Sequence, residues 1–151
     1  MIVAWRITKQ KHARSAFSGE GARLYGGRWN SKGRAVVYAS ESRALALTEM
    51  LVHLEAESLL LHYVLFRCEF DESLVQSIDS AGLPKNWAAD PPPNRNHAIG
   101  DKWIDSAASA VLRVPSAVVL GEMNYLLNPA HPDFAKIAIG AQKFKIDKRL
   151  K

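Results

Sequence analysis

The sequence predicts one domain of the α+β class. At 151 residues the chain can bury about two-thirds of the surface that its unfolded form exposes, and no Gly/Ser-rich linker divides it. Segments with strand character and segments with helix character also follow one another without the regular βαβ alternation of a parallel sheet. We therefore expect residues 1–151 to fold together as one compact domain.

The N-terminal third is predicted to contain two strands separated by a loop. IVAWRIT, within residues 1–8, is a mostly apolar run that ends at the polar segment KQKHAR. AVVYA, residues 35–39, has the β-branched composition of a short buried strand. Between them, five glycines interrupt any periodicity from Ser15 to Arg34, which predicts a loop that the rest of the domain must support.

A helix is predicted after the second strand, capped by Ser40 or Ser42 and continuing to about Glu57. It is apolar nearly all round from Ala44 to Leu54, which is typical of a buried helix. Glu49 therefore lies where a charge is costly, so its carboxyl group must be paired, hydrogen-bonded or protonated. From this segment alone, a structural Glu–Arg pair and a functional carboxylate are equally good interpretations.

The rest of the chain is predicted to add strands and one more helix. Residues 62–70 alternate, with Val64, Phe66, Cys68 and Phe70 on one face. The prolines of AADPPPN, residues 88–94, break regular structure because proline lacks a backbone donor. The remaining predicted elements are a strand at 74–78 that extends the sheet, a helix at 96–112, a strand at 116–121 and a last strand near 144–146.

Composition and charge restrict the kind of protein. The net charge of +5 is uneven: residues 1–34 carry +7, residues 35–134 carry −7 and residues 135–151 carry +5. Basic ends suit an anionic ligand, and they also suit nucleic acid. The apolar runs are too short for a membrane helix, and MIVAWRITKQK lacks the order of a signal peptide. The single cysteine, Cys68, fits a reducing compartment, so we expect a cytoplasmic protein.

Three further residues are candidates for ligand contacts. Arg28 follows two glycines, so the backbone there can approach a ligand closely and direct a guanidinium at phosphate oxygens. A tight turn with a solvent-facing arginine is the alternative. Tyr38 ends a predicted strand, where its ring could stack on a flat ligand or serve as ordinary core. Arg6, in the first strand, is a candidate second phosphate ligand or a partner for Glu49. The histidines His53, His62, His97 and His131 lack metal-ligand spacing, so no metal site is expected.

Two segments resemble a known family. GEGARLYGGRWNSKGRAVVYASESRALALTEML is similar to the core motif of the RES domain family, and PSAVVLGEMNYLLNPAHPDF is similar to its second motif. The resemblance runs from WRI near the N-terminus to about Ile146. It implies a fold related to the ADP-ribosyltransferases, with mixed or antiparallel sheets and flanking helices. It also implies a toxin of a bacterial toxin–antitoxin pair that consumes NAD as substrate and needs no further cofactor.

The resemblance also implies roles for individual residues. The family's arginine, tyrosine and glutamate correspond to Arg28, Tyr38 and Glu49, which become the expected catalytic residues. The implied NAD-binding set consists of these same arginine and tyrosine residues together with Arg6, Ser40, Ser116 and Asn124. In this reading one carboxylate, Glu49, stabilises the positive charge that develops on ribose as nicotinamide leaves. Arginines hold the pyrophosphate through forked hydrogen bonds, and the tyrosine packs against nicotinamide.

The acceptor and the partners follow from the resemblance only in outline. Water would make the protein an NAD glycohydrolase, inorganic phosphate a phosphorylase, and a protein side chain an ADP-ribosyltransferase. The implied partner is an Xre-type helix-turn-helix antitoxin that covers the basic, glycine-rich entrance, and a homodimer is the expected assembly. We expect no membrane association and no direct nucleic-acid binding. A basic nucleic-acid-binding module is the alternative from another class.

Overall fold

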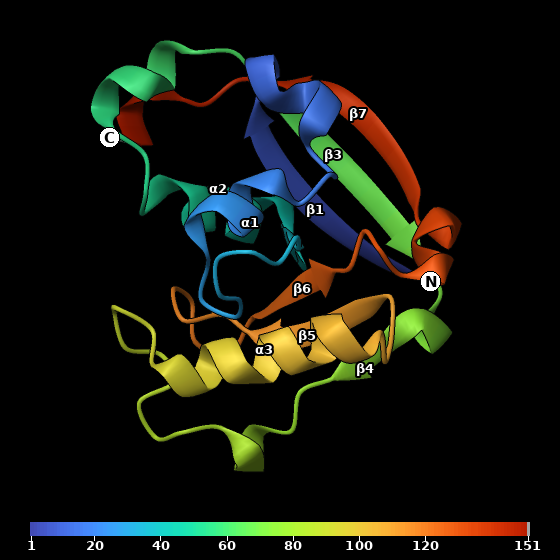
Figure 1. Cartoon of the computed structure of the whole chain (residues 1–151). Helices are drawn as coiled ribbons and strands as arrows, with labels where there is room; N and C mark the ends of the chain where they lie inside the picture. Colours follow the sequence, from blue (N-terminus) through green and yellow to red (C-terminus); the bar gives the residue numbers. More distant parts are fainter. Residues whose placement is uncertain (151) are drawn as a thin grey trace.

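One sheet and three α-helices make up the regular structure of residues 1–150, which the computed structural model describes; Lys151, the last residue of the predicted domain, lies outside the described residues. The strands are β1 (Ile2–Lys9), β2 (Val37–Ser40), β3 (Tyr63–Phe70), β4 (Val75–Ser77), β5 (Val111–Pro115), β6 (Met123–Leu127) and β7 (Ala138–Phe144) (Figure 1). The helices are α1 (Glu20–Tyr25), α2 (Arg43–Leu51) and α3 (Asn94–Ser106), with 3₁₀ turns at Gln10–Ser15, Ala56–Leu60, Glu72–Leu74, Ser80–Gly82, Pro132–Lys136 and Lys148–Leu150.

The strand order is β4-β5-β6-β2-β1-β3-β7, and every neighbouring pair is antiparallel except β4 and β5, which are parallel. β1 pairs with β3 along its whole length, but it pairs with β2 at one position, Trp5 with Ser40. The sheet is therefore continuous yet nearly divided into two halves, one made of β1, β3 and β7 and the other of β4, β5, β6 and β2. This mixed sheet with flanking helices confirms the predicted α+β class.

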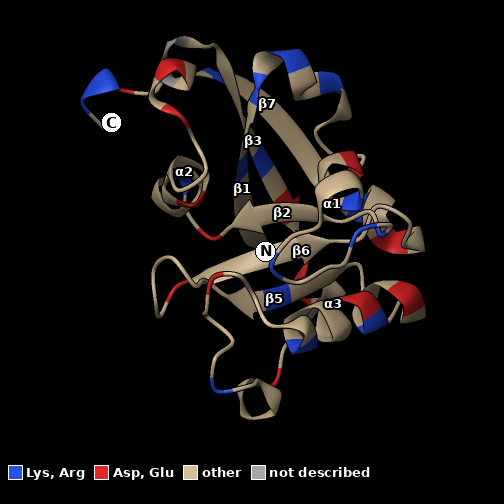
Figure 2. Cartoon of the chain, turned by 60° about the vertical axis from the view of Figure 1, so that its left-hand side comes forward, with Lys and Arg blue, Asp and Glu red and all other residues tan. Residues whose placement is uncertain are grey.

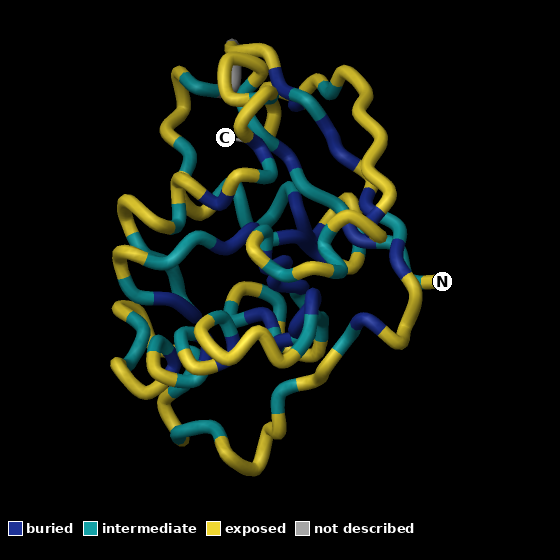
Figure 3. The backbone as a smooth tube through the Cα atoms, turned by 45° about the vertical axis from the view of Figure 1, so that its right-hand side comes forward, coloured by how far each residue is buried: buried dark blue, intermediate teal, exposed yellow. Residues whose placement is uncertain are grey.

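Apolar packing holds each half separately. α2 packs on β1 and β3 through a cluster that includes Ala46, Ile7 and Leu65, all of them buried. α3 covers the other half, where Trp103 joins Leu112 and neighbouring buried residues of β5 and β6 (Figure 1). Buried positions follow the strands through the centre of the molecule, while exposed positions follow the outer loops (Figure 3). Within residues 1–150 no helix is long and apolar enough to cross a membrane.

Two predictions for the N-terminal half need correction. The expected loop from Ser15 to Arg34 contains helix α1, which begins after Gly19 in the left-handed region (φ 74°) and has an ion pair between Arg23 and Glu20 on its surface. The expected helix to Glu57 ends at residue 51 instead. That helix is also only half-buried, because one stripe of its residues lines a cleft rather than the core.

The predicted elements between residues 96 and 121 are also misplaced. α3 ends before Ala107, which has a left-handed backbone (φ 50°), so residues 111–115 are free to form strand β5. The predicted strand at 116–121 was wrong: the Ser116 hydroxyl accepts hydrogen bonds from the amides of Val118 and Val119 and makes this segment a turn. The last strand, β7, lies before the predicted position because it is an exposed edge strand without an apolar run.

Candidate functional site

A cleft of about 1360 Å³ opens where the two halves of the sheet separate. Its walls come from β1 and β2 on either side of the single Trp5–Ser40 pair, from α2, and from the glycine-rich segment of residues 19–32. α2 contributes a stripe of lining residues at helical spacing: Ala46, Glu49 and Met50, followed by His53 just beyond the helix. The volume exceeds that of most small-molecule sites, so the cleft can hold a ligand as long as a dinucleotide.

Arg6 spans the gap between the two halves of the sheet. Beyond the Trp5–Ser40 pair the strands no longer form a ladder, and the Arg6 Nη1 group donates instead to the carbonyl oxygen of Tyr38 in β2, at 2.9 Å. Its Nε group donates to the carbonyl of Ala16, at 2.8 Å. Burial lowers the pKa of this guanidinium to about 10, so Arg6 remains a cation at neutral pH. Among residues 1–150 no ion pair joins it to Glu49, so the predicted partnership was wrong.

The glycine-rich loop has a fixed shape. Gly26 has a left-handed backbone (φ 74°), and Gly27 pairs with Asn30 in a tight bridge. Asn30 is fully buried, and its amide nitrogen donates to three backbone carbonyls of the surrounding chain. A side chain at position 27 has no room, because a Cβ there would lie 2.6 Å from the Tyr38 hydroxyl oxygen. The loop is therefore tied to strand β2 at this point.

The Tyr38 hydroxyl is used inside the protein. It donates to Asn30 Oδ1 at 2.6 Å and accepts from the backbone N–H of Trp29 at 3.1 Å. Burial raises the pKa of this hydroxyl above its usual value, so Tyr38 does not exchange protons near neutral pH. Tyr38 lines the cleft, and because its hydroxyl is engaged with the loop, the ring is the part available to a ligand.

Arg28 reaches a segment distant in sequence. Its Nη1 group donates to the carbonyl oxygens of Trp87 and Ala89, at 3.0 and 2.8 Å. The Trp87 ring stacks on Trp29, with centroids 6.3 Å apart, and the Asn96 amide donates to the same Trp87 carbonyl at 2.7 Å. Arg28 is half-buried and lines the cleft. It therefore presents a cation to the cleft while it secures the segment of residues 87–89.

Glu49 is held by neutral donors. Its Oε1 accepts from the Ser116 hydroxyl at 2.7 Å and from the Asn124 amide at 2.6 Å, and Asn124 Oδ1 accepts from the Ser40 hydroxyl at 2.7 Å. The structural interpretation in which an arginine satisfies this carboxylate is therefore wrong. A carboxylate without a cationic partner keeps its negative charge available to a positive group in the cleft.

The predicted site residues gather in one place. Six of them line the cleft: Arg6, Arg28, Tyr38, Ser40, Glu49 and Asn124. Ser116 lies behind them, fully buried against Glu49. Two residues of the site were not predicted: Asn30, although it stands two residues after Arg28, and Trp87, which no local pattern connects to the site.

Comparison with known proteins finds relatives that extend over nearly the whole chain. A family model described as the RES domain matches residues 3–148. A protein named Toxin Res from Yersinia enterocolitica is 39% identical over 152 residues, covering 99% of this chain and 100% of that protein. A protein named Prs ADP-ribosylating toxin from Sphingobium sp. is 40% identical, covering 97% of this chain and 94% of that protein.

A solved structure shows the same fold. It is a chain in the crystal structure of the M. tuberculosis MbcT–MbcA toxin–antitoxin complex, with a TM-score of 0.78 at 20% identity over 99% of this chain and 86% of that chain. Because the family model and these relatives extend over nearly the whole sequence, this chain belongs to the RES domain family.

Proposed function

We propose that this protein is the toxin of a toxin–antitoxin pair and that it acts by consuming NAD. It breaks the bond between nicotinamide and ribose and transfers the ADP-ribosyl group to water or to inorganic phosphate. The observation that carries this proposal is Glu49, a carboxylate with neutral partners at the wall of a cleft that also presents Arg6 and Arg28. The names of the Yersinia and Sphingobium relatives support the toxin role.

The chemistry needs few groups. When the bond between ribose C1′ and the nicotinamide nitrogen breaks, its electron pair stays on nicotinamide, which leaves as a neutral molecule. Positive charge develops on the ribose ring, and the carboxylate of Glu49 stabilises it. Since the leaving group needs no proton, a second carboxylic acid is unnecessary. The oxygen of water or phosphate then bonds to C1′, and a proton is released from water in the first case.

The arginines and the tyrosine have separate tasks in this proposal. Arg28 and Arg6 use guanidinium nitrogens that point away from their backbone carbonyl partners to bind the pyrophosphate. The Tyr38 ring packs against nicotinamide, while its hydroxyl stays in the loop. Fixing both ends of the dinucleotide sets the position of C1′ relative to Glu49.

The test is NAD turnover by the purified protein, alone and with added inorganic phosphate. Free nicotinamide is followed over time, and mass spectrometry identifies the ADP-ribose product. Glu49→Gln should lower kcat by about 10²–10³-fold or more, as expected for loss of a group that stabilises transition-state charge. Its fold should survive, because the amide oxygen of Gln can accept the same two hydrogen bonds. Equal turnover by wild type and Glu49→Gln would contradict the proposal.

Protein ADP-ribosylation is a second candidate, favoured by the name of the Sphingobium relative. In this case the acceptor is a protein side chain, and isotopically labelled ADP-ribose appears on a protein in the presence of labelled NAD. Release of nicotinamide without labelled protein, and with free ADP-ribose or its phosphate, favours water or phosphate as the acceptor. The product mass separates these outcomes in one experiment.

The charge distribution motivates the nucleic-acid alternative. Lys and Arg residues gather near the 3₁₀ helix after β1 and at the C-terminus, whereas α3 carries both acidic and basic residues (Figure 2). A nucleic-acid-binding module predicts salt-sensitive binding to DNA or RNA that Glu49→Gln leaves unchanged. Tight binding of DNA together with untouched NAD would select this alternative.

An antitoxin of the Xre helix-turn-helix type is the proposed protein partner. The cleft entrance carries exposed apolar residues beside the basic loop, including Tyr25 (79% exposed) and Val52 (53% exposed). We propose that the antitoxin covers this entrance and contacts Arg28. Arg28→Ala should therefore weaken the complex, and unchanged affinity would contradict this mode of inhibition. The homodimer stays a prediction, which sedimentation of the purified protein can check.

A further inference from the structure

Four side chains from different parts of the fold form one chain of hydrogen bonds that ends at Glu49. Ser40 and Asn124 face one another as a register pair between β2 and β6, and the Ser40 hydroxyl donates to Asn124 Oδ1 at 2.7 Å. The Asn124 amide nitrogen donates to Glu49 Oε1 at 2.6 Å. From the opposite side the Ser116 hydroxyl donates to the same oxygen at 2.7 Å.

The backbone fixes the direction of the hydrogen bond from Ser116. Its Oγ accepts from the N–H groups of Val118 and Val119, at 3.1 and 3.0 Å. Both N–H groups can only donate, so they occupy the acceptor sites of the hydroxyl and leave its one hydrogen for Glu49. With Asn124 donating as well, Oε1 receives two hydrogens and carries none of its own.

Ser40 performs the corresponding task for Asn124. A side-chain amide can present either its oxygen or its NH₂ group, and only the NH₂ group suits a carboxylate. With the Asn124 oxygen engaged by the Ser40 hydroxyl, the NH₂ group faces Glu49. Ser40 therefore acts on the carboxylate through the amide, without touching it.

Burial separates these residues from a ligand. Ser116 has no exposed surface and Ser40 is 4% exposed, whereas Glu49 is half-buried and lines the cleft. Within residues 1–150, Glu49 Oε2 has no hydrogen-bond partner, so it is the oxygen left for a substrate. Ser116 is thus placed behind the carboxylate, and Ser40, although it lines the cleft, exposes almost no surface to a ligand.

We propose that Ser40, Asn124 and Ser116 are positioning residues that lock the rotamer of Glu49 and direct its second oxygen to the reacting sugar. The proposal rests on the proposed function, and it replaces direct NAD binding as the task of the two serines. A glutamate on a helix has several accessible rotamers, and a fixed carboxylate avoids reorganisation when charge develops in the transition state. Neutral donors achieve this without cancelling the negative charge.

The kinetic test separates positioning from binding. Ser40→Ala should lower kcat by about 10–100-fold, the range found when a group that orients a functional ligand is lost, with KM for NAD changed by less than about twofold. Ser40→Thr keeps a hydroxyl and a strand-compatible shape, so it should recover most of the lost kcat. Ser109→Ala is the matched control: it removes a hydroxyl that bonds to Trp103 and the Val111 carbonyl away from the cleft, so kcat should be unchanged.

A second measurement does not depend on turnover. The side-chain NH₂ resonances of Asn124 are assigned in ¹⁵N-labelled protein by their loss in Asn124→Asp. We expect them to shift in Ser40→Ala and in Glu49→Gln, and to stay in place in Ser109→Ala. If the wild type leaves NAD intact while these shifts occur, the proposed function fails and the hydrogen-bond chain stands. The positioning role would be overturned if Ser40→Ala raised KM and left kcat constant. It would also be overturned if the Asn124 resonances kept their positions in both Ser40→Ala and Glu49→Gln.

Discussion

Arg28 donates from Nη1 to the carbonyl oxygen of Trp87 at 3.0 Å, although 59 positions separate the two residues. The same nitrogen reaches the carbonyl of Ala89, and the Trp87 ring stacks on Trp29, next to Arg28 in the chain. An arginine expected only to bind a phosphate therefore also holds a wall of the cleft. Under the proposed function, ligand binding and the order of residues 87–89 are therefore expected to be coupled through this one side chain.

Removal of this arginine should loosen the segment that it holds. In Arg28→Ala we expect faster hydrogen exchange at the amides of Trp87 and Ala89, which bond within their own turn. Arg95→Ala is the matched control, because Arg95 also donates to a backbone carbonyl, that of Gly82, but lies outside the cleft. Equal exchange rates at residues 87 and 89 in wild type and Arg28→Ala would show that the stacked tryptophans suffice.

Tyr38→Phe should distinguish the contribution of the Tyr38 ring from that of its hydroxyl. The substitution leaves the buried Asn30 Oδ1 and the Trp29 N–H without their partner, which typically costs about 1–3 kcal/mol in the free energy of unfolding. Because the hydroxyl is engaged with Asn30 and the Trp29 amide, and burial raises its pKa above the usual value, we expect it to take no part in an acid–base step, so kcat should fall by less than about tenfold. Urea denaturation and NAD turnover measure the two effects, and an intact fold with abolished turnover would contradict this division.

Replacement by alanine should have opposite effects on stability at two glycines that lie on helices. A Cβ at Gly100 in α3 would lie 1.5 Å from the Trp29 carbonyl oxygen, so Gly100→Ala must move the helix or the loop and should cost about 3 kcal/mol or more. At Gly21 in α1 a Cβ meets nothing within 4 Å, so Gly21→Ala should stabilise the protein by about 0.5–1 kcal/mol. Thermal unfolding of both variants checks the order, and similar melting temperatures would contradict it.

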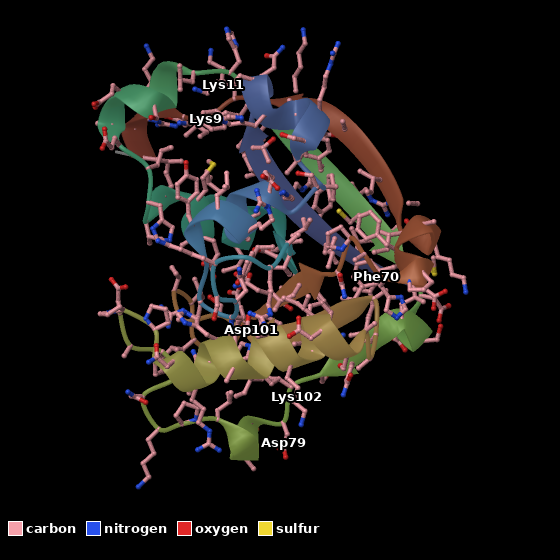
Figure 4. All side chains as sticks on the ribbon, in the orientation of Figure 1. Lys9, Lys11, Phe70, Asp79, Asp101 and Lys102 are labelled. Atoms are coloured by element: carbon pink, nitrogen blue, oxygen red, sulfur yellow. The ribbon has the colours of Figure 1, made fainter. Side chains whose placement is uncertain are left out.

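Asp101 should matter more than its neighbour Asp105. Asp101 accepts from both the N–H and the hydroxyl of Ser31, at 2.9 and 2.6 Å, and its side chain is 14% exposed. Figure 4 shows it on the side of α3 that faces this loop, with Lys102 on the opposite side. Asp101→Asn replaces one acceptor oxygen by an NH₂ group that faces a donor, which should cost about 1–3 kcal/mol.

The control for this prediction is Asp105→Asn on the same helix. Asp105 pairs with Arg34 at 2.8 Å, but its side chain is 54% exposed, so water and salt screen the pair. Its loss should lower the free energy of unfolding by less than the loss of Asp101 does. A larger loss in Asp105→Asn than in Asp101→Asn, measured by urea denaturation, would reverse the assignment of the loop anchor.

The local pattern of apolar residues predicted the long strands correctly. It failed where a side-chain hydrogen bond prevented an apolar run from forming a strand. β1 and β3 are apolar runs that pair over their full length, so composition located them correctly. The run after β5 looks like a strand, but the Ser116 hydroxyl takes two of its amides, and no propensity scale contains that bond. β7 is an exposed edge strand without an apolar run, and backbone pairing with β3 makes it a strand.

The site divides in the same way. Arg28, Tyr38 and Glu49 lie within 21 positions of one another, on a loop, a strand and a helix in succession, so their proximity can be inferred from the sequence. The hydrogen-bond partners of Glu49 could not be predicted from local pattern, because Ser116 and Asn124 are 67 and 75 positions away in the sequence. The sequence also suggested an arginine for Glu49, whereas the fold uses Arg6 to join β1 to the Tyr38 carbonyl.

The single Trp5–Ser40 pair between β1 and β2 makes the cleft the line along which the two halves of the molecule are least connected. A ligand that contacts Arg6, Tyr38 and Glu49 touches both halves at once, so it adds contacts across a boundary where the two strands pair at one position. Ligand binding should therefore raise the unfolding temperature of the protein, in addition to supplying the substrate for the reaction. We therefore expect proteases to cleave the empty protein more readily than the ligand-bound protein, so that occupancy of the cleft sets how long the protein persists.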